Sequence, residues 1–330
     1  MLITQTPLRI SFAGGGTDLE DYYRSEEGTV LSTAIDKYIF VLVKERYDDK
    51  IVLSWTIKEI VNNINEIQHD LIREGLLLTK AMKGLEVITT ADIPSEGSGL
   101  GSSSAVTVGL LNAFHTFQGE LVSSEQLAQE ACKIEMETLR NPVGKQDQYI
   151  AAYGSFRQFT FHCDGSVTTE FINISRETKR LLKAQLVLFY TNKTRSAAQI
   201  LSEQKNNIGQ RHDILKKMKN QVFELRQYLE NGEVDGVGDL LHEGWCLKQR
   251  LSSQITNSEI DVMYHKARQA GAIGGKVLGA GGGGFMLLFC PVEKQEELRH
   301  ELRMYKEMPF RFESGGSKVI FNIKQDTWKV

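Results

Sequence analysis

The sequence predicts an α+β protein of two domains, and three observations support this class. The chain has 330 residues, which is about two domains at roughly 150 residues each. Hydrophobic residues make up 41% and charged residues 25%, values typical of a globular chain that can bury a sizeable core. In the second half, the order of strand-like and helix-like stretches resembles a split β-α-β unit, in which antiparallel strands lie beside helices.

The first half of the chain is expected to be rich in strands. Its apolar stretches contain many Val, Ile, Tyr and Thr residues, a composition typical of β-structure. The expected strands cover residues 8–12, 28–35, 38–46, 50–54 and 85–90, followed by a β-rich segment at 155–174. Apolar residues three or four apart, among them Ile60, Ile64 and Ile67, predict a helix over 57–79. Two more helices are expected at about 102–118 and 124–139.

The second half is expected to be mainly helical. A short apolar strand at 186–190 precedes a helical pattern over about 196–270, which is broken near 231–232 and 252–257. The remaining expected elements are strands at 276–279 and 284–289, a helix at 292–304 and a last strand at 318–323. The polar stretch near residue 180 is the expected boundary, which gives an N-terminal domain of residues 1–180 and a C-terminal domain of residues 181–330.

Charge and cysteine content exclude several classes of protein. Lys and Arg number 39 and Asp and Glu number 42, so no basic excess points to a nucleic-acid partner. The four cysteines are far apart, without the paired spacing of a zinc site, and free thiols suit a reducing cytoplasm. The N-terminus lacks the pattern of a signal peptide, and no run approaches 18 apolar residues. We therefore expect a cytoplasmic protein without a membrane partner.

A glycine- and serine-rich loop at 94–105 directly precedes the expected helix at 102–118. The first turn of a helix presents unpaired N–H groups and the positive end of its dipole, and glycines before it let the backbone approach a phosphate. A serine-capped helix after a flexible loop explains the same pattern equally well. The loop is not a Walker A motif, because no Gly-Lys-Ser/Thr follows, and it lacks the strict GxGxxG spacing of a dinucleotide site.

Two further segments favour ligand binding. In PLRISFAGGGTD at 7–18, Arg9 lies on an expected strand and Asp18 follows a glycine turn. In GAGGGGF at 279–285, five glycines fall within six positions between two expected strands. A run this rich in glycine is a poor strand, so we expect a tight connection and a close approach of Gly281 and Gly282 to a ligand.

These three segments, in this order, resemble the GHMP kinase superfamily, which includes galactokinase, homoserine kinase and mevalonate kinase. The resemblance covers essentially the whole chain. It implies the GHMP kinase fold, with an N-terminal ribosomal-S5-domain-2-like domain, a C-terminal ferredoxin-like domain and the active site in the cleft between them. It also implies ATP as a substrate, with its phosphates over a loop made of Gly97, Ser98, Gly99, Leu100, Gly101, Ser102, Ser103 and Ser104.

Three stretches resemble one branch more narrowly. The opening PLRISFAGGGTD, GKQDQY at 144–149 and WCLKQRLSSQITNSEID at 245–261 are similar to bacterial D-glycero-D-manno-heptose 7-phosphate kinases. The resemblance implies phosphorylation of the anomeric hydroxyl, giving a 1,7-bisphosphate for nucleotide-activated heptose synthesis. The fucokinase branch is similar in the first two stretches, so a kinase of an unphosphorylated sugar is the alternative. A non-catalytic nucleotide-binding protein on the same fold is a third hypothesis.

The resemblance also implies roles for single residues. Asp147 matches the family's catalytic Asp, and Arg9 matches the basic residue that keeps such a carboxylate ionised. Glu135 and Ser103 match the family's Mg²⁺ ligands, and we prefer Glu135 to Glu137 because the two point to different sides of a helix. The structural alternatives are a helix-capping Asp, an ion-paired strand Arg and a surface Glu.

Substrate-binding residues are expected at three places. Asp18 matches the Asp that holds sugar hydroxyls in galactokinase, and Thr17 is expected to add a hydrogen bond. The Glu-His pair that precedes this Asp in galactokinase is replaced by Gly15-Gly16, which argues against galactose and leaves room for a larger sugar. A distal phosphate needs a cationic anchor, for which Lys193, Arg195 or both are proposed, with Lys248 and Arg250 as second candidates. Polar residues at a helix start are equally ordinary. The expected partners are small molecules, and a homo-oligomer is left open.

Overall fold

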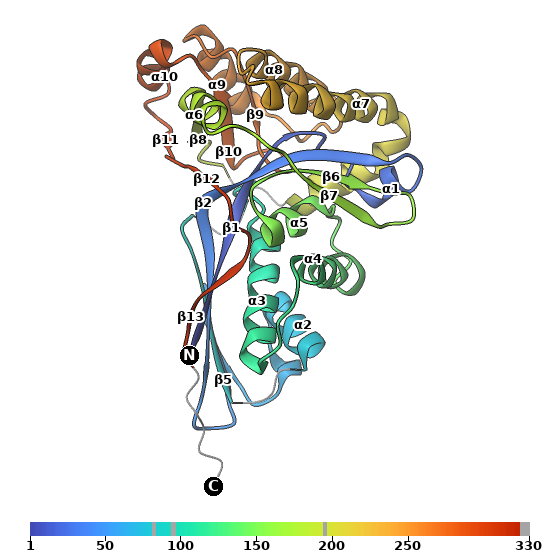
Figure 1. The fold of residues 1–330 in the computed structure, drawn as a ribbon, viewed down its shortest axis with the longest axis vertical. Helices are drawn as coiled ribbons and strands as arrows, with labels where there is room; N and C mark the ends of the chain where they lie inside the picture. Colours follow the sequence, from blue (N-terminus) through green and yellow to red (C-terminus); the bar gives the residue numbers. More distant parts are fainter. Residues whose placement is uncertain (81–83, 94–96, 194–196, 324–330) are drawn as a thin grey trace.

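The computed structural model describes residues 1–80, 84–93, 97–193 and 197–323. The chain forms a large sheet covered by helices, together with a smaller, mainly helical unit (Figure 1). The α+β class expected from the sequence is confirmed. No helix in the described ranges combines the length and apolar character needed to cross a bilayer.

The large sheet is built around two long strands, β1 (Leu2–Ala13) and β2 (Gly28–Glu45). They pair antiparallel, and β2 then pairs with β6 through its first half and with β5 through its second half. The other strands are β3 (Ile51–Ser54), β4 (Lys58–Val61), β5 (Leu85–Ala91), β6 (Phe156–Phe161), β7 (Val167–Phe171), β12 (Phe312–Glu313) and β13 (Lys318–Asn322).

The two strands expected at 28–35 and 38–46 form one continuous strand, β2. Asp36 and Lys37 suggest an interruption because they are charged residues between two apolar runs. The ladder with β1 shifts register opposite them, between Pro7 and Leu8, so the extra residues are accommodated by a bulge. Asp36 also exchanges hydrogen bonds with the backbone of Arg311, which fastens this point to the C-terminal segment.

Four helices pack on one side of the large sheet (Figure 1). They are α2 (Asp70–Thr79), α3 (Ser102–Gln118), α4 (Ser124–Cys132) and α5 (Gln146–Tyr153), while the short α1 (Glu20–Tyr23) lies before β2. α3 contains no Asp, Glu, Lys or Arg and packs directly against β1 and β2. Gly109 permits this close approach, because a Cβ there would lie 2.8 Å from the Thr6 hydroxyl oxygen.

The helix expected over 57–79 is wrong in its first half. Residues 58–61 form β4, a 3₁₀ turn follows at Ile64–Glu66, and α2 begins only at Asp70. The isoleucines that set the spacing do not share one buried face, since Ile60 is 58% exposed. Asn63 ends the strand and caps the 3₁₀ turn by accepting a hydrogen bond from the Asn65 N–H (3.0 Å).

The smaller unit is a four-stranded antiparallel sheet in the order β11-β8-β10-β9, covered by helices. Its strands are β8 (Leu186–Tyr190), β9 (Gly274–Val277), β10 (Phe285–Phe289) and β11 (Lys306–Glu307). Its helices are α6 (Arg176–Gln185), α7 (Ala197–Asn231), α8 (Gly236–Lys248), α9 (Ser258–Gln269) and α10 (Gln295–Glu301), with a 3₁₀ turn at Val292–Lys294. This order is the split β-α-β arrangement expected from the sequence.

The last expected strand lies in the other sheet. Residues 318–322 form β13, which pairs antiparallel with β1, and β12 pairs with β2. The fourth strand of the smaller sheet is instead β11, only two residues long. Sequence pattern identifies a strand but not its partner, which explains the error. The division of the chain at residue 180 falls inside α6 and stays a prediction.

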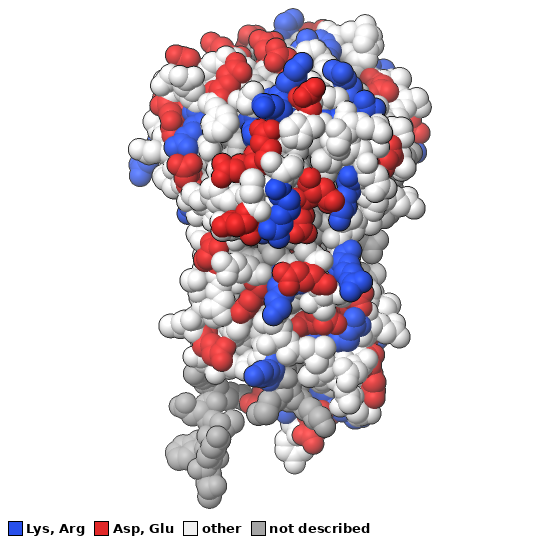
Figure 2. All heavy atoms as spheres, turned by 90° about the vertical axis from the view of Figure 1, so that its right-hand side faces the viewer, with Lys and Arg blue, Asp and Glu red and all other residues white. Residues whose placement is uncertain are grey.

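Charged side chains are mixed on the face shown in Figure 2. Lys and Arg lie next to Asp and Glu over both units. Several are paired, such as Arg226 with Glu170 and Arg299 with Glu307. This distribution agrees with the small formal net charge of −3.

A buried histidine between two carboxylates gives a testable pH dependence. His115, near the end of α3, contacts Glu120 through Nδ1 and Glu130 through Nε2, each at 2.7 Å. Burial lowers the pKa of His115, but the hydrogen bonds with Glu120 and Glu130 outweigh it, so its pKa is raised above 6.5. The group is therefore stabilising below the unfolded pKa of about 6.5, and this contribution is lost as the pH rises through the higher folded pKa.

We expect His115→Gln to lower the free energy of unfolding at pH 6 by roughly 1.5–3 kcal/mol, the range for hydrogen bonds to charged groups. At pH 9 the variant and the wild type should differ less. Urea unfolding at both pH values measures this, with His265→Gln, an exposed position on α9, as the control. An equal effect of His115→Gln at both pH values would contradict the charged pairing.

Candidate active site

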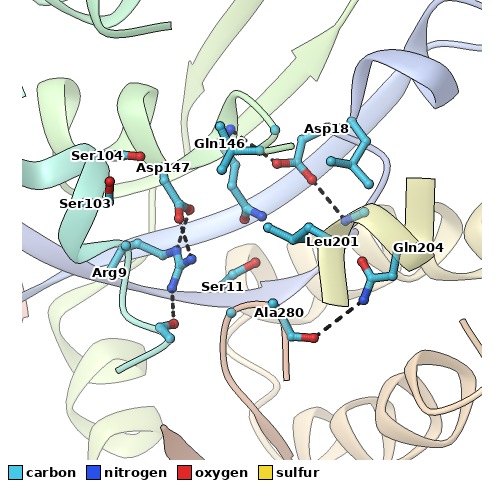
Figure 3. Close-up of a pocket in the computed structure, with 18 of the residues that line it drawn as sticks. Arg9, Ser11, Asp18, Ser103, Ser104, Gln146, Asp147, Leu201, Gln204 and Ala280 are labelled. Carbon is cyan, nitrogen blue, oxygen red and sulfur yellow. Dashed lines mark hydrogen bonds and ion pairs between the residues drawn. The ribbon is translucent and has the colours of Figure 1, made fainter. Parts of the chain in front are cut away.

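A cavity of about 600 Å³ lies where the two units meet. β1, the loop before α3 and the start of α5 line it from one side. The other side is lined by α7, the end of α8, Lys276, Gly279 and Ala280. Figure 3 shows Arg9, Asp147, Asp18 and Gln204 pointing into this space from separate elements. Most of the segments singled out in the sequence therefore meet at one place.

The loop before α3 presents its backbone to the cavity. Gly97, Gly99 and Gly101 all have positive φ angles of 66–76°, which glycine adopts without strain. Gly101 is the N-cap of α3 and has no side chain to accept a hydrogen bond from the first turn. Ser102, Ser103 and Ser104 line the cavity beside these N–H groups. The 17-residue helix therefore opens onto the cavity as a site for an anion.

Two members of the loop have internal structural roles. Leu100 is fully buried in the hydrophobic core and does not line the cavity. Its carbonyl accepts a hydrogen bond from the Arg9 N–H (3.0 Å), which ties the loop to β1. The Ser98 hydroxyl lies 2.8 Å from the Ser102 hydroxyl. The loop is thus held in shape before any ligand binds.

The glycine run after β9 supports this loop by backbone contact. The Phe285 N–H donates to the Ser98 carbonyl (3.1 Å), and a Cβ at Gly284 would lie 2.4 Å from that same oxygen. Gly281 and Gly282 pack against Ile255, to whose carbonyl the Gly282 N–H donates (2.7 Å). Neither glycine lines the cavity, contrary to their expected approach to a ligand; the cavity wall here is formed by Gly279 and Ala280.

Arg9 and Asp147 form a two-pronged ion pair at the centre of the cavity. Arg9 Nε donates to Asp147 Oδ1 and Nη2 to Oδ2, both at 2.7 Å, and Nη1 donates to the Gly99 carbonyl. The Arg9 side chain is 4% exposed, whereas that of Asp147 is 23% exposed. A Cβ at Gly101 would lie 3.3 Å from Asp147 Oδ2, so the carboxylate adjoins the mouth of α3.

Glu135 is a buried carboxylate that lines the cavity beside Ser103 and Ser104. It lies in a π-helical segment, Lys133–Thr138, that continues α4 within the helix expected at 124–139. Its Oε2 accepts hydrogen bonds from the hydroxyls of Ser104 (3.1 Å) and Ser103 (3.5 Å). Burial, with a smaller effect of Asp147, raises its pKa to about 7. A buried carboxylate beside hydroxyls and an anion site is a donor set that fits a hard divalent cation, whereas Glu137 is exposed.

Asp18 lines the opposite end of the cavity. It accepts hydrogen bonds from the N–H groups of Gly16 (2.9 Å) and Gln146 (3.4 Å). Burial, followed by the nearby charge of Asp147, raises its pKa. Gly15 and Gly16 also line this end. Thr17 does not, because its buried hydroxyl donates to the carbonyls of Gly14 and Thr29, so the expected hydrogen bond to substrate is not supported.

The expected cationic anchors fall into two groups. Lys193 and Arg250 do not line the cavity, and Lys193 is paired with Glu259 (3.0 Å). Arg195 lies outside the described residues. Lys248, the second candidate, does line the cavity, and so does Lys276, which sequence analysis missed. A lysine within a short apolar strand before the glycine run was the available signal.

Other lining residues were not assigned a role from the sequence, although some of them lie in the motif segments. Ser11, Gln146 and Gln204 supply polar groups, and Leu201, Met218 and Leu251 supply apolar surface. The Ser11 hydroxyl and the side-chain amide oxygen (Oε1) of Gln146 are buried and have no hydrogen-bond partner in the described part of the chain. Buried polar atoms are nearly always satisfied, so these two oxygens indicate a polar ligand.

The site can therefore hold a polyanion against the α3 amides and a hydroxyl group in front of Asp147. Comparison with known proteins agrees with this chemistry. The family model of the GHMP kinases N terminal domain matches residues 57–155, and the family model of the GHMP kinases C terminal domain matches residues 225–307.

Individual relatives are similar over most of the chain. A D-glycero-alpha-D-manno-heptose 7-phosphate kinase of Campylobacter jejuni is 31% identical, over 91% of this chain and 92% of its own. A solved structure described as a D-glycero-D-manno-heptose 1-phosphate kinase from Bacteroides thetaiotaomicron has a TM-score of 0.82 at 25% identity, over 98% of this chain and all of its own. A bifunctional fucokinase/GDP-fucose pyrophosphorylase of Arabidopsis thaliana is 26% identical over 99% of this chain and 32% of its own.

Proposed function

The chain belongs to the GHMP kinase family, and from this premise we propose that it transfers the γ-phosphoryl group of ATP to the anomeric hydroxyl of D-glycero-D-manno-heptose 7-phosphate. The reaction class is that of a phosphotransferase with an alcohol group as acceptor. The product is a heptose 1,7-bisphosphate, a precursor suited to nucleotide activation.

One observation carries the proposal: Asp147 adjoins the amide-rich start of α3, and Arg9 holds its carboxylate in place. A phosphate at the helix start and a hydroxyl at Asp147 are thereby neighbours. Phosphoryl transfer depends mainly on such positioning and on neutralising charge, since the protein performs little covalent chemistry itself.

The transfer forms one P–O bond and breaks another. The anomeric oxygen forms a bond to the γ-phosphorus, the bond from that phosphorus to the β,γ-bridging oxygen breaks, and ADP leaves with the electron pair. The hydroxyl proton passes to the Asp147 carboxylate as the new bond forms, and is then released to solvent. Arg9 holds the Asp147 carboxylate through the ion pair and adds positive charge beside the transferred group.

We propose Mg²⁺ as the metal cofactor, with Glu135 and Ser103 as its protein ligands. Support comes from the burial of the Glu135 carboxylate, its raised pKa and the hydroxyls beside it. Bound Mg²⁺ neutralises phosphate charge and orients the polyphosphate.

The heptose assignment rests on the acceptor end and on the relatives. Gly15 and Gly16 leave the cavity open beside Asp18, which suits a larger acceptor than a hexose. The descriptions of the two heptose kinases both name a phosphorylated heptose. One gives heptose 7-phosphate and the other heptose 1-phosphate. The fucokinase relative supports the alternative, a kinase of an unphosphorylated sugar.

The described cysteines are unpaired, which is in keeping with the cytoplasmic location we propose.

ADP release over a panel of acceptors tests the proposal. The panel contains heptose 7-phosphate, unphosphorylated heptose, fucose and galactose, each with Mg²⁺ and with a chelator. We expect the highest kcat/KM for heptose 7-phosphate and almost no turnover with the chelator. If fucose is phosphorylated and heptose 7-phosphate is not, the alternative function is established instead.

A further inference from the structure

Two buried lysines face the cavity from the smaller unit and have no role in the chemistry derived above. Lys248 ends α8 and Lys276 lies on β9. They are 7% and 6% exposed. Lysine is almost never buried to this degree without a partner, so both positions require an explanation.

Their hydrogen bonds are incomplete. Lys248 Nζ donates to the carbonyls of Val277 (2.8 Å) and Gly279 (2.6 Å), and Lys276 Nζ donates to the carbonyl of Phe12 (3.1 Å). An ammonium group has three N–H donors, so one on Lys248 and two on Lys276 remain. Neither lysine forms an ion pair with a carboxylate within the described ranges.

The electrostatics of both lysines favour a nearby anion. Burial, with a smaller effect of Arg9, lowers the pKa of Lys276 to about 7. Burial also lowers the pKa of Lys248, with smaller effects of Lys276 and Arg9. None of the acidic residues that line the cavity pairs with these lysines in the described ranges. Asp147 is paired with Arg9, and Glu135 and Asp18 belong to the N-terminal part of the chain, across the cavity from the lysines. An anionic ligand would restore the charged form of both lysines.

The anchor of Lys276 lies away from the start of α3, whereas Lys248 is bonded to Gly279, which packs against Gly99 of the loop at 97–104. Lys276 is anchored at Phe12, three residues beyond Arg9 on β1, or about 10 Å along the strand. Ser11, whose buried hydroxyl lacks a partner among the described residues, lies beside this anchor on the same strand. An acceptor that presents its reacting hydroxyl to Asp147 would therefore extend its far end toward these donors.

We propose that Lys248 and Lys276, with the Ser11 hydroxyl beside them, bind the phosphate that the acceptor sugar already carries. This inference rests on the proposed function and names the residues that distinguish a sugar phosphate from a free sugar. It replaces Lys193, whose ammonium group is paired with Glu259 outside the cavity.

Steady-state kinetics of Lys248→Met and Lys276→Met test the assignment with heptose 7-phosphate and unphosphorylated heptose. We expect KM for heptose 7-phosphate to rise roughly 10- to 100-fold in each variant, the loss of one charge-assisted hydrogen-bonding group. KM for unphosphorylated heptose and for ATP should stay within about twofold. The matched control is Lys183→Met, because Lys183 is a half-buried lysine that donates to a backbone carbonyl (Leu186) outside the cavity.

A binding measurement makes the test independent of turnover. With Mg²⁺ and a non-hydrolysable ATP analogue saturating the polyphosphate site, inorganic phosphate should raise the Tm of the wild type and of Lys183→Met, but not of the two cavity variants. Inorganic phosphate should also compete with heptose 7-phosphate in wild-type kinetics, so a variant that fails to fold does not remove the test.

The outcomes separate this inference from the proposed function. If the wild type prefers heptose 7-phosphate and both variants keep that preference, the function stands and the lysine assignment is wrong. Equal losses for phosphorylated and free heptose would also overturn it, because the lysines would then serve the transferred group. If the wild type does not use heptose 7-phosphate, the proposed function fails, and the phosphate-induced Tm shift still decides whether the lysines bind an anion.

Discussion

Replacing Asp147 by Asn is expected to lower kcat by about 10²- to 10⁴-fold, the usual contribution of a positioned general base. The amide keeps the shape of the side chain and one oxygen that can accept from Arg9, but it cannot take the proton of the acceptor hydroxyl. The α3 amides and the loop at 97–104 are untouched by the change. The Kd of a non-hydrolysable ATP analogue should therefore stay near that of the wild type.

Asp213→Asn is the matched control, since Asp213 is an exposed carboxylate on α7. Single-turnover kinetics with heptose 7-phosphate, together with calorimetric titration of the ATP analogue, separate chemistry from binding. Near-normal turnover of Asp147→Asn would remove Asp147 from the proton-accepting role. Loss of nucleotide binding would show instead that the ion pair with Arg9 supports the loop.

The glycine-rich loop before α3 could be read from the sequence because its shape depends on local chemistry. Glycines at alternate positions before a helix start form the loop at 97–101 through their own φ angles. The glycine run at 279–284 was also recognised, but its contacts were not. Gly281, Gly282 and Gly284 contact Ile255 and Ser98, whereas Gly279 lines the cavity, and such contacts depend on the tertiary fold.

Long-range pairing explains the other errors. Residues 318–322 form the expected strand, yet their partner is β1, more than 300 residues earlier in the sequence. Lys276 was overlooked because burial beside Phe12 exists only after two sheets meet. Thr17 was expected to contact the substrate because its neighbour Asp18 matches the sugar-binding Asp of galactokinase, but its hydroxyl is bonded to the carbonyls of Gly14 and Thr29.

The second large effect is expected at Glu135. Without metal, the pKa of this carboxyl is about 7 in the folded protein, against 4.5 for an unperturbed Glu. Between these values the folded state binds more protons than the unfolded state. The free energy of unfolding therefore falls as the pH rises from about 4.5 to about 7, by about 3 kcal/mol in total.

Glu135→Gln removes this titration, so in a chelator its stability should change less than that of the wild type between pH 5 and pH 8. The same variant should lose roughly a hundredfold in kcat, because the proposed metal site loses its charged ligand. Glu137→Gln, two residues away and exposed, should behave as the wild type in both measurements. Urea unfolding at pH 5 and pH 8, and ADP release over a range of Mg²⁺ concentrations, give the two readouts. If Glu135→Gln keeps the wild-type pH profile and Mg²⁺ dependence, this carboxylate neither titrates in the folded state nor binds the metal. The burial of Glu135 beside Ser103 and Ser104 would then be purely structural.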